Sequence, residues 1–208
     1  MPRRNSPRSG NLRRALSQEA ARIMSEHGIQ DYGTAKRKAA ERFGVTTEGM
    51  LPRNSEVEAS LAEYQRLFAA GSHEATLDAQ RRAALQAMRA LAQFSPRLVG
   101  PVLSGTATVH ADVQLHVFTD NPDAVAINLI ERGVGHETGK HRLRIDAERF
   151  ASFPSVSFQI DAQQIDATVF PLDGIRQAPL SPVDGRPMRR ADATELAGLI
   201  GRAGQDGR

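Results

Sequence analysis

Three polar side chains stand at alternate positions in the segment DVQLH: Asp112, Gln114 and His116. In an extended strand alternate residues share one face, so the spacing predicts an acid, an amide and a histidine side by side. Another acid, Asp166, lies among apolar residues in the segment QIDATVF, where a half-buried carboxylate needs a partner. If the two strands are neighbours, Asp112 and Asp166 form a candidate site for Mg²⁺ or Mn²⁺, because hard cations bind carboxylate oxygens.

A turn of small residues precedes the first of these strands. Ser104, Gly105 and Thr106 offer backbone N–H and hydroxyl groups of the kind that bind phosphate oxygens. His116 has two interpretations: it is either a ligand that suits Mn²⁺ or Zn²⁺ better than Mg²⁺, or a packed histidine of the sheet.

The segment SPVDGRPMRRA predicts a loop that carries three guanidinium groups, those of Arg186, Arg189 and Arg190. Guanidinium groups bind phosphate and carboxylate in a planar, bidentate manner, so we expect this loop to contact an anion. The alternative is that these arginines pair with surface acids or are solvated. His136 and His141 flank the sequence ETGK, and their spacing indicates no metal site.

The elements that must position these residues change type near residue 97. Before it, apolar residues recur at helical spacing, and Gly28 and Gly44 end the first two helices. Ser55 followed by Glu58 predicts a capping box for the third helix. After residue 97, strands and helices alternate. The expected helices cover about residues 12–27, 32–43, 57–68, 75–94, 120–133 and 192–202; the expected strands cover 97–103, 112–119, 141–146, 155–161 and 164–170, with a turn at 161–163.

Residues 75–172 contain a long helix, a short strand, a Gly/Ser turn, a strand with alternating polar residues, a helix and a strand with a further acid. This order resembles the nucleotidyltransferase superfamily, the polymerase-beta-like fold. In that family three carboxylates hold two divalent ions, which align an attacking hydroxyl with the α-phosphate of an NTP. The resemblance implies that Asp112 and Asp166 ligate metal, that Gln114 replaces the second catalytic acid, and that residues 104–106 hold the triphosphate.

The chain as a whole therefore predicts an α+β fold, a nucleotidyltransferase-like mixed sheet with flanking helices and an N-terminal helical extension. We expect a basic disordered head at 1–11, a helical region at 12–72, an α/β core at 73–203 and a flexible tail at 204–208. The first fourteen residues carry five Arg and no acid, which is typical of a solvated tail or of a contact with nucleic acid.

Three functional hypotheses follow. The leading one is Mg²⁺- or Mn²⁺-dependent transfer of a nucleotidyl group from an NTP to an acceptor that the sequence does not identify: a protein, an RNA or a small molecule. Gln114 favours the second, a catalytically decayed nucleotide- or RNA-binding regulatory module, because an amide cannot supply the charge that bridges two metals. The third is a protein-interaction adaptor that uses the front helices.

Composition favours a soluble, cytoplasmic protein. The 208 residues include no Cys, so a disulfide is excluded, and the formal net charge of +3 does not by itself indicate a nucleic-acid partner. No segment approaches the roughly 18 apolar residues of a membrane span, and no apolar stretch follows the N-terminal arginines as in a secretory signal. We therefore expect no membrane partner.

Overall fold

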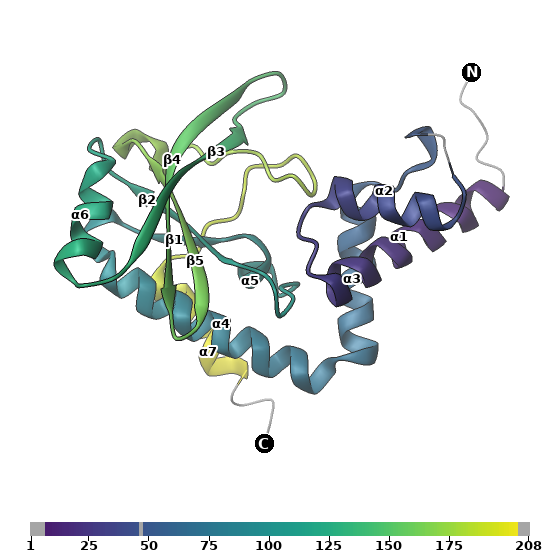
Figure 1. Ribbon diagram of the computed structural model, residues 1–208, viewed down its shortest axis with the longest axis horizontal. Coiled ribbons are helices and arrows are strands. Elements are labelled where there is room, and N and C mark those ends of the chain that lie inside the picture. Colours follow the sequence, from purple (N-terminus) through teal and green to yellow (C-terminus); the bar gives the residue numbers. More distant parts are fainter. Residues whose placement is uncertain (1–6, 46–47, 204–208) are drawn as a thin grey trace. The chain divides into compact units, whose positions relative to one another are not determined.

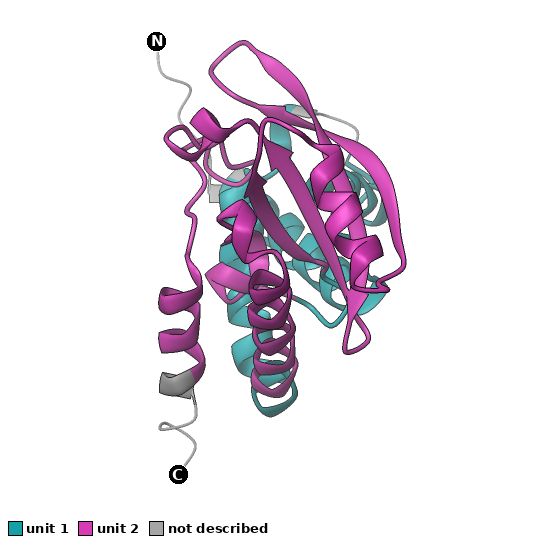
Figure 2. Cartoon of the chain, turned by 90° about the vertical axis from the view of Figure 1, so that its left-hand side faces the viewer, with its two compact units in different colours: residues 1–73, 108–111 teal, residues 74–107, 112–208 magenta. Residues whose placement is uncertain are grey.

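The computed structural model describes residues 7–45 and 48–203. The chain divides into two compact units (Figure 2): unit 1 comprises residues 1–73 and 108–111, and unit 2 comprises residues 74–107 and 112–208. The expected tail at 204–208 and the first six residues of the expected head lie outside the described residues. None of the described helices is both long and apolar enough to cross a membrane.

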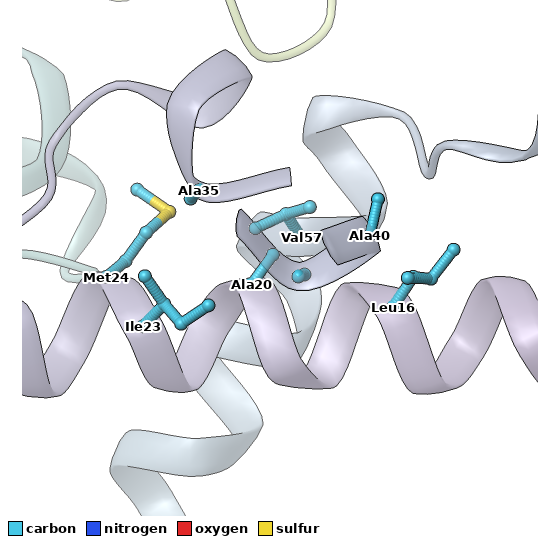
Figure 3. Close-up of a cluster of buried hydrophobic side chains, with 8 residues drawn as sticks. Leu16, Ala20, Ile23, Met24, Ala35, Ala40 and Val57 are labelled. Carbon is cyan, nitrogen blue, oxygen red and sulfur yellow. The ribbon is translucent and has the colours of Figure 1, made fainter. Parts of the chain in front are cut away.

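Unit 1 contains three helices that pack on one another: α1 (Pro7–His27), α2 (Tyr32–Arg42) and α3 (Asn54–Phe68), with the short 3₁₀ helix η1 (Glu48–Met50) before α3. Figure 3 shows the apolar cluster between them, in which Leu16, Ala20 and Ile23 of α1 meet Ala35 and Ala40 of α2 and Val57 of α3. The spacing of these α1 residues is the helical repeat expected from the sequence.

The ends of these helices follow from local chemistry. Gly28 ends α1 in the left-handed region at φ +68°, where a side chain would be strained. The Asp31 side chain begins α2 by accepting a hydrogen bond of 2.7 Å from the Thr34 backbone N–H. The capping box expected from Ser55 and Glu58 is wrong by two residues: the Glu56 carboxylate accepts from the Arg53 N–H at 2.6 Å.

Helix α1 begins at Pro7, so the last residues of the expected disordered head are helical. Helix α4 (Ala70–Ala90) follows α3 after a single residue and begins five residues earlier than its apolar stripe predicts. It ends in the 3₁₀ helix η2 (Ala92–Phe94), before Pro96.

Unit 2 is built on a five-stranded mixed sheet in the order β1-β2-β5-β4-β3 (Figure 1). Only β2 and β5 pair in parallel; the other neighbouring strands are antiparallel. The strands are β1 (Arg97–Val99), β2 (Val113–Phe118), β3 (His136–Arg144), β4 (Phe150–Ile160) and β5 (Gln163–Phe170), and the accompanying helices are α5 (Gly100–Ser104), α6 (Asp123–Glu131), η3 (Leu172–Ile175) and α7 (Ala193–Ala203). The α+β class is therefore confirmed.

The two faces of this sheet differ in chemistry. One face carries the apolar alternate residues, including Val113 and Leu115 of β2 and Ile165 and Ala167 of β5, which are all fully buried. Helices α4, α6 and α7 lie beside the sheet (Figure 1). The other face carries the polar alternate residues, and the candidates Gln114, His116 and Asp166 belong to it.

Two local expectations have different outcomes. The strand expected at 97–103 is wrong beyond Val99, because Gly100 takes φ +70° and the chain then turns into α5. The hairpin expected after residue 160 is confirmed: Asp161 and Ala162 take φ +48° and +64°, as in the two-residue turns that join antiparallel strands.

Candidate functional site

The parallel pairing of β2 and β5 brings the predicted residues together, but with a different partner. Gln114 lies directly opposite Asp166, and His116 lies opposite Thr168. Asp112 precedes β2 by one residue, so it is two residues away from the position beside Asp166. The expectation that Asp112 and Asp166 lie side by side is therefore corrected: the neighbour of Asp166 is the amide of Gln114.

The polar face continues onto the flanking strands. Ser157 and Ser155 of β4 lie opposite Asp166 and Thr168, and Arg97 of β1 lies opposite His116. Residues opposite one another in a sheet project from the same side, so Arg97 belongs to this face. We call the following residues the polar face: Arg97, Gln114, His116, Ser155, Ser157, Asp166 and Thr168.

His116 is buried and neutral. Arg190 donates a hydrogen bond of 3.0 Å from Nε to Nδ1 of His116, so Nδ1 must hold a lone pair and the ring proton sits on Nε2. Burial first, and the positive charge of Arg190 second, lower the pKa of His116 to about 3. Figure 1 places β2 inside the sheet, between β1 and β5, as this burial requires.

Arg190 fastens the C-terminal segment of unit 2 onto the polar face. Its Nη1 donates to the carbonyl oxygen of Gly174 at 2.8 Å, and its Cζ lies 5.0 Å and 5.2 Å from the ring centroids of Phe118 and Phe170. Cations above aromatic rings are stabilised by the ring quadrupole. The third nitrogen of the Arg190 guanidinium, Nη2, is buried and has no hydrogen-bond partner among the described residues.

Two guanidinium groups share this half of the face. Burial first, and repulsion from Arg97 second, lower the pKa of Arg190 to about 10. Among the described residues, Arg97 donates only to the neutral carbonyl oxygens of Ser95 and Pro96, at 3.2 Å and 3.0 Å. Two cations that repel each other, one with a buried unused donor, form an environment that favours a bound anion.

In the other half of the face a carboxylate is paired with a histidine. His141 of β3 reaches over β4: its Nε2 lies 3.1 Å from Oδ2 of Asp166, and its Nδ1 lies 2.9 Å from Oγ1 of Thr168. The hydrogen bond to Asp166, opposed by burial, raises the pKa of His141 above its ordinary value. Oδ1 of Asp166 is buried and lacks a hydrogen-bond partner in residues 7–45 and 48–203.

Gln114 is held by close packing. Gly100 has φ +70°, which favours glycine, and a Cβ there would come within 2.4 Å of Oε1 of Gln114. The amide therefore lies against the first residue of α5.

The backbone donors of the turn that was expected to hold a triphosphate form hydrogen bonds with the preceding helix, α5. The backbone N–H groups of Gly105 and Thr106 donate to the carbonyl oxygen of Pro101 at 2.8 Å and 3.0 Å, and the hydroxyl groups of Ser104 and Thr106 are 2.9 Å apart. The residues close the C-terminal end of α5, which carries the negative end of a helix dipole. The expected N–H donors for phosphate are thus not available in this arrangement.

Of the three loop arginines, Arg190 alone is seen to contact the polar face. Arg189 forms an ion pair with Glu195 in α7, and Arg186 is exposed in the turn that follows Asp184. Arg97 and His141, which do contribute, were not predicted as site residues. Both residues occupy alternate positions of their strands, β1 and β3. This pattern identifies them as site residues only once the strand order is known.

The polar face does not fit the two-metal centre that the resemblance implies. Oδ2 of Asp166 is paired with His141, and its neighbour Gln114 is uncharged. Among the described residues, no group of three or more His, Cys, Asp or Glu side chains is placed to hold a metal ion. Metal ligation by Asp112 and Asp166 stays a prediction, and no step is derived from it.

Comparison with known proteins does not assign the chain to a family, so the proposed function rests on the geometry of the site. No protein-family model, no curated protein and no solved structure matches this chain.

Proposed function

We propose that unit 2 binds a nucleotide on the polar face and does so without a catalytic pair of metal ions. One observation carries the proposal: Nη2 of Arg190, a guanidinium whose pKa the charge of Arg97 helps to lower, is a buried donor without a hydrogen-bond partner in the described part of the chain. A phosphate group accepts from guanidinium groups and removes the repulsion between them.

A second unused atom of opposite character supports a nucleotide over a simple anion. Oδ1 of Asp166 accepts hydrogen bonds only, so it suits a ribose hydroxyl or a base amino group. A ligand that presents a phosphate at one end and a hydrogen-bond donor at the other matches both halves of the face. A nucleotide is such a ligand, and the resemblance to the nucleotidyltransferase superfamily favours the same class.

Metal-dependent nucleotidyl transfer is the second candidate, and one observation favours it. Asp112 lies directly before β2, and Asp166 lies on β5, the strand that pairs with β2 in parallel. Gln114 between them argues for binding without transfer, because it supplies no charge to bridge two ions.

Thermal melting separates the candidates. We expect NTPs to raise the melting temperature of the wild type in the presence of EDTA, by a stabilisation of about 2.7 kcal/mol at roughly 100 times Kd. Glu131→Gln, on the exposed side of α6, serves as a charge control and keeps the whole shift. A shift that requires Mg²⁺ or Mn²⁺ and disappears in both Asp112→Asn and Asp166→Asn favours transfer instead. If no NTP raises the melting temperature, both nucleotide binding and nucleotidyl transfer are rejected.

A further inference from the structure

The β3–β4 hairpin is longer than the rest of the sheet. β3 pairs with β4 from His136 to Arg144, but β4 pairs with β5 only from Ser155 onward. The β3–β4 pairing therefore continues past the last β4–β5 pair as far as Arg144 and Phe150, and Figure 1 shows this end of the hairpin extending away from the sheet. β3 is also the outermost strand.

One side of this end of the hairpin carries a row of cations. Lys140, Arg142 and Arg144 occupy alternate positions of β3, so their side chains leave the same face about 7 Å apart. All three residues are exposed. Their partners on β4 are Pro154, Ser152 and Phe150, none of which is acidic, while Glu137 belongs to the opposite face.

An aromatic ring stands at the end of the row. Phe150 is 52% exposed, and the Arg142 guanidinium lies 4.8 Å from its ring centroid. An exposed ring beside cations can stack on a nucleobase while the cations contact the backbone. We call Lys140, Arg142, Arg144 and Phe150 the basic strip.

Internal partners do not neutralise the strip. Arg144 donates to the carbonyl oxygens of Asp146 and Ala147, which carry no net charge. The nearby carboxylate of Asp146 pairs with Arg149 instead. Within residues 7–45 and 48–203, none of the three cations of the strip forms an ion pair.

We propose that the basic strip binds single-stranded nucleic acid. The cations in a row contact successive phosphates, and Phe150 stacks on a base, a combination that duplex backbones do not offer because their bases are stacked inside. This surface shares no residue with the polar face, so it goes beyond the proposed nucleotide site and fails or holds independently of it.

Fluorescence anisotropy of the full chain with labelled single-stranded RNA and DNA of roughly 12 nucleotides tests the proposal. Lys140→Gln with Arg142→Gln is expected to weaken binding about tenfold and to reduce the slope of log affinity against log salt by about 1.4 for two lost phosphate contacts. Phe150→Ala is expected to weaken binding by about tenfold with the salt slope unchanged.

The matched control is Lys36→Gln with Arg37→Gln in α2, which removes the same charge from unit 1. It is expected to bind as the wild type does. Three results would overturn the proposal: no binding by the wild type at low salt, an equal loss in the control, or a duplex of the same length bound as tightly as the single strand.

Discussion

Two histidines, His116 in the polar face and His141 in contact with it, have opposite electrostatic surroundings. His116 accepts a hydrogen bond from Arg190, and burial first and the positive charge of Arg190 second lower its pKa to about 3. His141 is partly exposed, and its hydrogen bond to Asp166 raises its pKa. At neutral pH the first half of the face therefore carries two guanidinium groups and a neutral histidine, and the second half carries a carboxylate that is hydrogen-bonded to a histidine.

This difference indicates which half receives a ligand anion. A carboxylate that already has a cationic partner adds little attraction for a phosphate, and it repels one if the histidine loses its proton. Arg97 and Arg190 form no ion pair within the described residues, and His116, with a pKa of about 3, adds no third positive charge. We infer that the phosphate binds on the side of β1 and β2.

The largest expected effect comes from removing the cation that joins the face to the C-terminal segment. Arg190→Met leaves Nδ1 of His116 and the carbonyl oxygen of Gly174 without their donor. We expect a loss of about 3 kcal/mol in the free energy of unfolding, measured in urea. Arg189→Met is the neighbouring control; its exposed ion pair with Glu195 predicts a change below about 1 kcal/mol. Equal effects of the two changes would contradict the role of Arg190.

The second effect is acid sensitivity from His116. Its folded pKa of about 3 lies below the ordinary 6.5, so the unfolded chain binds the proton first and stability falls as the pH falls below 6.5. Between pH 6.5 and pH 5 this loss amounts to about 2 kcal/mol. In His116→Gln that part of the pH dependence should vanish from urea unfolding curves. An unchanged pH dependence would show that His116 is not held neutral.

His141 makes a contribution to stability that depends on pH in the opposite direction and is smaller. Its folded pKa is raised, so its stabilisation is fully present below pH 6.5 and is lost as the pH rises through the folded value. Asp166→Asn should lower the pKa of His141 in an NMR titration and reduce stability by about 1 kcal/mol at pH 6, with less effect at pH 9. A His141 titration that is the same in both proteins would refute the pairing.

The sequence predicted which face of the sheet each side chain lies on better than it predicted the register, that is, which residues of neighbouring strands lie opposite each other. Alternation in DVQLH and QIDATVF correctly assigned Gln114, His116 and Asp166 to one face. Parity alone does not determine which pair of residues lies opposite, because sliding a strand by two residues keeps every side chain on its face. For this reason Asp112 was expected where Gln114 lies.

Long-range contacts explain the rest of the difference. Arg190 reaches the face because its neighbour Ala191 exchanges backbone hydrogen bonds with Leu98 of β1, whereas Arg189 points to α7. No local pattern in SPVDGRPMRRA distinguishes these two arginines. His141 reaches Asp166 because β3 folds back on β4 next to β5, a pairing of residues far apart in the sequence.

Melting of Arg97→Gln with and without ATP tests the central claim most directly, because Arg97 faces the site without fastening any other segment to it. Without ATP we expect the melting temperature to equal or exceed that of the wild type, since the repulsion of Arg190 is removed. With ATP we expect the stabilisation to fall by about 1.5 kcal/mol, the contribution of a charged hydrogen bond. A variant that keeps the whole ATP shift would contradict an anion site at Arg97 and Arg190.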